Sequence, residues 1–130
     1  MHKIFVYGTL MRGESNEHVM KHARFIGEGT TPGSVYGYGY APGAVRPDHK
    51  AHRGGLIHGE LYEVPEGTKQ ILDMLEGVEH GNYTLTPVKV TMDAGLETGD
   101  GSVEEDAEIY FHNHYREYGS YNAERWKPEF

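Results

Sequence analysis

The chain contains no cysteine, and no stretch of it is apolar for long enough to span a membrane. The first absence excludes disulfide bonds and thiolate zinc sites. The second argues against a transmembrane helix, which needs about 20 apolar residues. The N-terminus also lacks the charged and then apolar pattern of a signal peptide. We therefore expect a cytoplasmic protein without a membrane partner.

Positive charge is scarce and unevenly distributed. The chain has 12 Lys and Arg against 20 Asp and Glu, which gives a net charge of -8. No Lys or Arg occurs between Val90 and Tyr115, where seven acids lie, so the remainder is nearly balanced with 13 acids (20 minus 7) against 12 bases. Because phosphate contacts require clustered Lys and Arg, we expect no nucleic-acid partner. The acidic segment 93–106 is predicted to be a solvated hairpin connection.

The composition favours strands and turns. With 130 residues the chain fits one domain, 1–130, and its 18 Gly and 10 Tyr indicate short strands joined by turns. We predict an α+β fold, with extended chain broken by turns at 33–55 and strands at 4–7, 56–64, 83–92 and 106–115. The last two are expected to pair in antiparallel fashion, and the tail 116–130 to pack back on the body.

Two helices are predicted. Ser15 can cap a short helix that extends to about Phe25, and Thr68 can cap a second one that Gly77 ends. Between them, Gly59 lies in the middle of the strand 56–64, which indicates a bulge or a close backbone approach, and Pro65 ends that strand.

The first candidate site is the turn Tyr7-Gly8-Thr9-Leu10 at the end of the first strand. It can be an ordinary connection. Its backbone N–H groups can also converge on a carboxylate or a developing oxyanion, provided that the glycine allows an unusual conformation. A nucleotide-binding loop is excluded, because neither the three-glycine fingerprint nor a Gly-Lys-Ser/Thr pattern occurs.

Glu76 is the second candidate. It follows Leu75 on the last turn of the second predicted helix, where the negative end of the helix dipole and any burial disfavour the carboxylate and raise its pKa. A raised pKa prepares a general base. The alternative is an exposed Glu at a helix end, although helices prefer cations there.

Other chemistries find less support. The pairs His18/His22 and His112/His114 could each offer two metal ligands, but two ligands do not complete a site, and incidental surface histidines are the better interpretation. The segment around Gly101 does not match an EF-hand loop. No Cys exists and no Ser has a G-x-S-x-G setting, so a covalent acyl-enzyme is not expected.

Several motifs together resemble one family. The sequences VYGTLMRGESN, YGYAPGAV, GELYEV and LDMLEG, the last followed by Tyr83, resemble the gamma-glutamylcyclotransferase-like proteins, which include gamma-glutamylamine cyclotransferases and the AIG2-like group. The resemblance extends in order from about Lys3 to Tyr110 and does not map the tail beyond it. The YGTL turn and the glutamate of LEG are its most specific marks.

The resemblance implies a small mixed β-barrel flanked by short helices. It also implies that the backbone of Tyr7, Gly8, Thr9 and Leu10 holds the glutamyl end of a substrate, with Tyr83 also at the binding site, and that Glu76 is the general base. The chain departs from the family where an Arg often occurs, because Leu85 occupies that position. A second acid, Glu79, lies in the same loop.

The chemistry implied by the resemblance is an intramolecular cyclisation. The α-amine of a gamma-glutamyl amide attacks its own γ-carbonyl and releases 5-oxoproline and a free amine or amino acid, as in cofactor-independent transferases or lyases. The only partner implied is the small-molecule substrate. A binding module without turnover is the alternative, and a histidine-dependent metal hydrolase is a more distant one. The sequence determines neither the leaving amine nor the oligomeric state.

Overall fold

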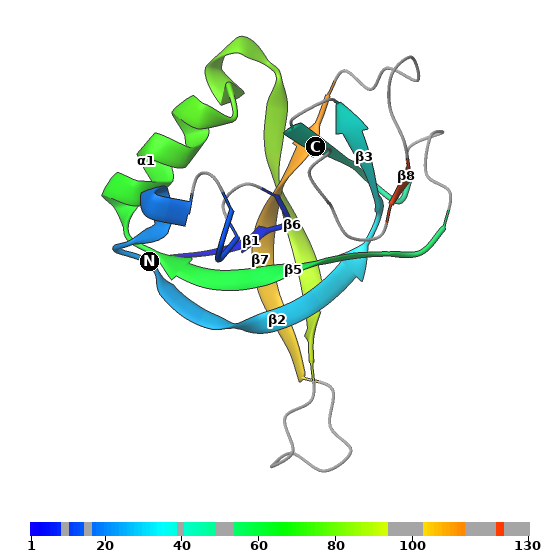
Figure 1. Ribbon diagram of the computed structural model, residues 1–130, viewed down its shortest axis with the longest axis horizontal. Helices are drawn as coiled ribbons and strands as arrows, with labels where there is room; N and C mark the ends of the chain where they lie inside the picture. The colour runs from blue at the N-terminus through cyan, green and yellow to red at the C-terminus, as the bar shows by residue number, and fades with distance from the viewer. Residues whose placement is uncertain are drawn as a thin grey trace.

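The protein is described from a computed structural model that covers residues 1–8, 11–14, 17–38, 41–48, 54–93, 103–113 and 122–123. Within them, five strands form a closed barrel in the order β1-β5-β2-β6-β7 (Figure 1). The bounds of these strands are β1 His2–Val6, β2 Arg24–Pro32, β5 Leu56–Val64, β6 Tyr83–Met92 and β7 Val103–His112. The predicted mixed barrel is confirmed.

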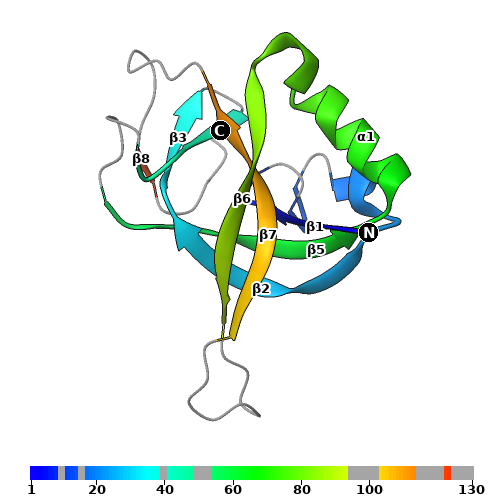
Figure 2. The same ribbon diagram turned by 180° about the vertical axis from the view of Figure 1, so that it is seen from behind.

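The barrel contains both antiparallel and parallel strand pairs. β1 runs antiparallel to β5 and parallel to β7, and β2 is antiparallel to both β5 and β6. β6 and β7 form a long hairpin whose register runs from Tyr83 opposite His112 to Met92 opposite Val103 (Figure 2). The predicted antiparallel pair is thus confirmed. The acidic connection is shorter than predicted, because residues 103–106 already belong to β7 and residues 94–102 lie outside the described part.

A second, three-stranded sheet has the order β4-β3-β8. It consists of β3 Ser34–Tyr38, β4 Ala41–Val45 and β8 Asn122–Ala123. The prediction of extended chain broken by turns is confirmed for this hairpin. Since β8 pairs with β3, this part of the tail lies on the body of the protein, whereas the rest of 116–130 lies outside the described residues.

The first predicted helix is wrong. Instead of a helix from Ser15 to Phe25, a single turn of 3-10 helix, η1, covers Glu17–Met20, and Phe25 belongs to β2. Ser15 lies outside the described residues. The competing interaction is the long antiparallel pairing of β2 with β5, in which Phe25 lies opposite Tyr62, with the two ring centroids 5.5 Å apart. Tertiary pairing outweighs a weak helical spacing.

The second predicted helix is α1, Glu66–Leu75, and its N-terminus differs from the prediction. The cap is Pro65, whose carbonyl accepts a hydrogen bond from the Lys69 amide at 3.0 Å, while Thr68 is buried in the first turn. Its C-terminus is as predicted. Gly77 takes a left-handed conformation with φ of 64° and is followed by the short 3-10 helix η2, Val78–His80.

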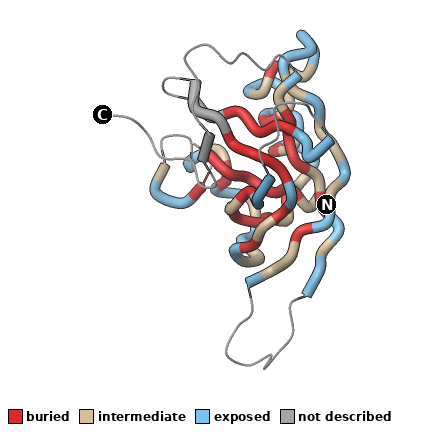
Figure 3. Tube along the Cα trace, turned by 90° about the vertical axis from the view of Figure 1, so that its right-hand side faces the viewer, coloured by how far each residue is buried: buried red, intermediate tan, exposed pale blue. Residues whose placement is uncertain are grey.

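The buried residues, coloured red along the chain in Figure 3, form two clusters. One face of the strands, including Phe5 and Leu61, forms a first cluster with Val35 and Ala44 of the small sheet and fills the barrel. The other face packs under α1 and η1 in a second cluster, made of Ile4, Val6, Met11, Met20, Tyr62, Val64, Leu72 and Tyr110. This second cluster supports the candidate site.

Gly59 is required by a close approach, as predicted. A Cβ atom added there would lie 2.3 Å from the carbonyl oxygen of Val6. The β-bulge itself lies in the neighbouring strand, between Phe25 and Gly27. None of the described helices is both long and apolar enough to cross a lipid bilayer.

Candidate functional site

The turn after β1 is held by its own backbone. Tyr7 and Gly8 are buried, and the Gly8 carbonyl accepts a hydrogen bond from the Met11 amide at 3.0 Å. Thr9 and Leu10 lie outside the described residues. Gly8 is not among the described glycines with positive φ, so the turn does not depend on a left-handed conformation at this position.

The side chain of Tyr7 anchors the start of the turn. Its hydroxyl donates to the carbonyl oxygen of Tyr110 at 2.9 Å and accepts a hydrogen bond from the Ala44 amide at 3.3 Å. It therefore ties the end of β1 to β7 and β4. Both partners are backbone groups, so this side chain sets the position of the chain from which the turn departs.

Glu76 is the C-terminal cap of α1. Its backbone amide donates to the Leu72 carbonyl at 2.9 Å, and its side chain is partly buried. No hydrogen bond or ion pair reaches the Glu76 carboxylate from the described part of the chain, and burial raises its pKa to about 7. The predicted direction of the pKa shift therefore agrees with the structure. Such a group exchanges protons near neutral pH.

Glu79 occupies a different environment. It is exposed on η2, where it lines a surface groove together with Gln70, Met74 and His80. The left-handed Gly77 separates the two acids, because it ends α1 and redirects the chain toward Asn82. Glu76 is partly buried and its pKa is raised by that burial, whereas Glu79 is exposed to solvent.

The buried phenol of Tyr110 lies near Glu76. The sequence did not point to this tyrosine. The hydroxyl of Tyr110 donates to Asp73 Oδ1 at 2.6 Å, and Lys69 Nζ donates to the other oxygen of Asp73 at 2.8 Å. Burial raises the pKa of Tyr110, and the negative charges of Asp73 and Glu76 raise it further, so the phenol keeps its proton. Tyr110 thus connects helix α1 to the strand that anchors Tyr7.

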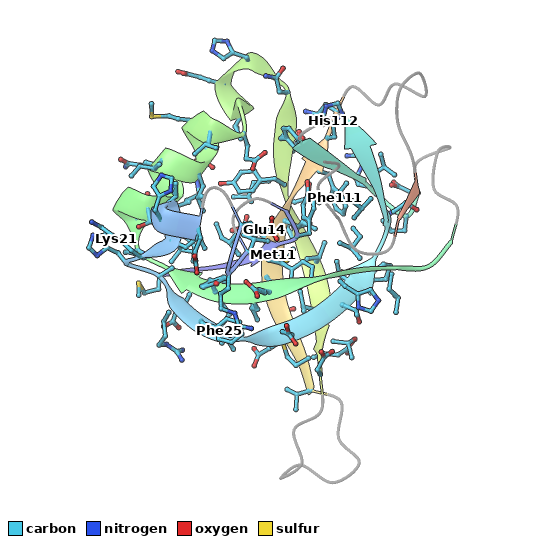
Figure 4. The ribbon with its side chains drawn as sticks, in the orientation of Figure 1. Met11, Glu14, Lys21, Phe25, Phe111 and His112 are labelled. Carbon is cyan, nitrogen blue, oxygen red and sulfur yellow. The ribbon has the colours of Figure 1, made fainter. Side chains whose placement is uncertain are left out.

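Tyr83 begins β6 close to the same cluster. Its ring meets the ring of His112 edge-on, with centroids 4.8 Å apart and an interplanar angle of 85°. Figure 4 labels His112 at the end of β7 and Met11 beside the barrel. Tyr83 and Leu85 both pack against the second cluster. Leu85 is therefore a packing residue.

The histidine pairs form no metal centre in the described part of the chain. His18 and His22 are exposed, and His114 lies outside the described residues. No group of three or more potential metal ligands occurs among the residues that the structure describes.

A second buried carboxylate was not predicted. Glu60 on β5 accepts hydrogen bonds from the backbone amide of Arg12 at 2.9 Å and from Arg12 Nε at 3.0 Å. The sequence places two acids, Glu60 and Glu63, in the strand 56–64 and does not distinguish the buried one. Its partner could not be inferred, because 48 residues separate the two along the chain.

Most of the chain is similar to proteins of one known family. The family model described as gamma-glutamyl cyclotransferase, AIG2-like, matches residues 4–128. A Vibrio cholerae relative, provisionally named a gamma-glutamylcyclotransferase, is 40% identical over 79 residues, which are 59% of this chain and 64% of that protein. The chain thus spans less than two thirds of that relative.

Two further proteins match a larger share of their own length. A Methanocaldococcus jannaschii relative with the same provisional name is 36% identical over 99 residues, which are 75% of this chain and 78% of that protein. The crystal structure of an AIG2-like protein from Mus musculus superposes with a TM-score of 0.74 at 29% identity, covering 98% of this chain and 88% of that one. The chain belongs to the gamma-glutamyl cyclotransferase, AIG2-like family.

Proposed function

We propose that the protein is a cyclotransferase that acts on gamma-glutamyl amides and releases 5-oxoproline. The observation that carries this proposal is Glu76, a partly buried acid at the end of α1 whose pKa is raised to about 7 by burial. It is supported by the family match over residues 4–128 and by the names of the relatives.

The reaction needs no nucleophile from the protein, because the substrate contains one. The α-amine attacks the γ-carbonyl carbon, a new C–N bond closes the five-membered lactam, and the former amide C–N bond breaks. The products are 5-oxoproline and the leaving amine. The protein must fold the substrate, remove a proton from its ammonium group and stabilise the oxyanion of the tetrahedral intermediate. Neither a metal nor an organic cofactor is required by this chemistry.

Glu76 is assigned both proton transfers. As a carboxylate it takes one proton from the α-ammonium before attack and a second from the ring nitrogen after attack, and as a carboxylic acid it passes each of them to the leaving nitrogen, which departs as an ammonium. A group whose pKa is about 7 performs both roles near neutral pH. General acid and base catalysis of this kind contributes a factor of roughly 100 to 10,000.

The turn that follows Tyr7 is assigned to the glutamyl end of the substrate. Its backbone N–H groups can hold the α-carboxylate or the oxyanion, and one well-aimed oxyanion donor contributes about 3 to 4 kcal/mol. The support is its construction, since the Tyr7 hydroxyl and the Met11 amide hold both sides of the turn. Met11 also packs in the same cluster as Leu72 of α1. Tyr83, which packs against that cluster, is assigned to the wall of the binding site.

The test is a screen for 5-oxoproline release. Gamma-glutamyl amino acids, gamma-glutamyl-lysine and glutathione are incubated with the wild-type protein and with Glu76→Gln, and 5-oxoproline is measured by chromatography. We expect release from at least one compound by the wild type and not by the variant. Binding of these compounds without any release would instead favour a non-catalytic module of the same fold, and loss of activity on adding a chelator would favour metal chemistry.

A further inference from the structure

We propose that Glu60 is a positioning residue that fixes the end of the turn after Tyr7 by binding Arg12. The inference rests on the proposed function insofar as that turn holds the substrate. Glu60 itself lies on β5 and contacts the turn only through residue 12.

Three side chains from two strands, Glu60, Glu28 and Phe25, surround the guanidinium of Arg12 and are called its socket. Glu60 on β5 and Glu28 on β2 lie directly opposite one another in the sheet, which is unfavourable for two acids. Arg12 lies between them, with Nε 3.0 Å from Glu60 Oε2 and Nη2 3.6 Å from Glu28 Oε1. Its guanidinium also stacks on the ring of Phe25, 3.9 Å from the ring centroid. The positive charge of Arg12 thus reduces the electrostatic repulsion between Glu60 and Glu28.

The carboxylate of Glu60 does more than balance the charge of Arg12. It is only 6% exposed, and three donors satisfy it. These donors are the Arg12 amide and the Tyr62 hydroxyl on Oε1, at 2.9 Å and 3.1 Å, and Arg12 Nε on Oε2. Binding of the main-chain amide matters most, because it fixes the path of the backbone at residue 12 independently of the flexible Arg side chain. A buried carboxylate requires such donors.

This contact completes the support of the turn. Tyr7 is held at the start, Met11 is hydrogen-bonded to Gly8 and only 7% exposed, and Arg12 is bound immediately afterwards. Substrate-binding amides must be held to within about 0.5 Å of the productive geometry to bind the substrate well. Glu60 is therefore expected to determine how well the turn binds the glutamyl end.

The first experiment measures the turn without any substrate. Glu60→Gln keeps the size of the side chain, but its amide group faces Arg12 Nε with a second donor. Hydrogen exchange followed by NMR should show the Met11 and Arg12 amides exchanging at least about tenfold faster, while the amides of β1 are unchanged. Glu63→Gln is the matched control, since Glu63 lies on the same strand and pairs with Arg24 at 3.2 Å. Unchanged exchange at Met11 and Arg12 would overturn the proposal.

The second experiment separates positioning from general stability. With the best substrate of the screen, Glu60→Gln should raise KM at least about tenfold and leave kcat within about threefold, with the acid limb near pH 7 retained. Replacing Arg12 as well, in Glu60→Gln/Arg12→Met, removes the conflicting donor and should recover part of the lost affinity. An unchanged KM in the folded variant, or a double variant no better than the single one, would overturn the proposal.

A milder variant covers the case in which Glu60→Gln does not fold. Tyr62→Phe removes one of the three donors to Glu60 and leaves both contacts to Arg12 in place. Amide exchange at Met11 and Arg12 should become faster and KM should rise, each by a smaller factor than in Glu60→Gln. If either quantity does not change, the result counts against the proposal. If the wild type releases no 5-oxoproline at all, the proposed function fails, whereas the exchange experiment still decides whether Glu60 holds the turn.

Discussion

Two carboxylates near the second cluster have opposite surroundings. Glu60 accepts hydrogen bonds from three donors, two of them on Arg12. Glu76 receives none from the described residues, and burial raises its pKa to about 7. Among the described residues, the same chemical group is held by donors at one position and left without them at the other. The comparison agrees with the proposals that Glu60 positions the turn and that Glu76 transfers protons.

The largest expected effect is on turnover at Glu76. Glu76→Gln keeps the volume of the side chain but cannot accept the ammonium proton, so kcat should fall by at least about a hundredfold while the protein remains folded. In the wild type, kcat/KM should rise with pH along an acid limb centred near the pKa of about 7, because only the ionised carboxylate is a base. Steady-state 5-oxoproline release from about pH 5 to 9 measures both.

Glu79→Gln is the matched control for this experiment. Glu79 lies in the same loop but is exposed, so its removal should leave kcat nearly unchanged. If Glu79→Gln were inactive and Glu76→Gln active, the roles of the two acids would be reversed. If both variants were active, proton transfer by an acid of this loop would not be part of the mechanism.

Glu76 could be predicted from the sequence because its surroundings are local. A helix of ten residues and a following Gly77 determine its position at the helix end, which predicted the direction of its pKa shift. The strands of the barrel were predictable for a similar reason. Residues 56–64 and 83–92 have the composition of strands and end at Pro65 and at the acidic segment.

The support of the site could not be predicted, because it depends on contacts between distant segments. Glu60 meets Arg12 only after β5 has paired with β1, and Tyr110 meets Asp73 only after α1 has packed on β7. The error at 15–25 has the same origin. Helical spacing is a local signal, whereas Phe25 belongs to β2 because it pairs with Tyr62 of β5, which is distant in the sequence.

The pH dependence of stability should report the raised pKa of Glu76. The folded-state pKa of Glu76 is raised to about 7 from its ordinary value of 4.5, so between these pH values the folded protein holds a proton that the unfolded chain has lost. Rising pH therefore destabilises the wild type through this window. Glu76→Gln should equal the wild type near pH 4 and exceed its free energy of unfolding by about 3 kcal/mol above about pH 8. Urea unfolding at both pH values measures the difference, and equal stability at high pH would contradict the raised pKa.

The anchor at the start of the turn should have a moderate effect. Tyr7→Phe removes the hydroxyl that binds the Tyr110 carbonyl and the Ala44 amide, and leaves both of these buried backbone groups without that partner. The loss should be about 1 to 3 kcal/mol in the free energy of unfolding, measured by urea denaturation. Because the start of the turn loosens, KM should rise as well, whereas the acid limb set by Glu76 should not move. An unchanged KM would show that the position of the turn does not depend on the hydroxyl of Tyr7.

The smallest effect is expected at Glu28, the second acid around Arg12. Its contact is longer, 3.6 Å between Glu28 Oε1 and Arg12 Nη2, and its side chain is 47% exposed, against 8% for the side chain of Glu60. Exposed ion pairs contribute little, and Glu28→Gln also removes the repulsion of Glu60 across the strands. We therefore expect KM and kcat within about twofold of the wild type and an unfolding midpoint within experimental error. A loss as large as that of Glu60→Gln would mean that Arg12 is held by the total negative charge of the socket and not by the buried hydrogen bonds of Glu60.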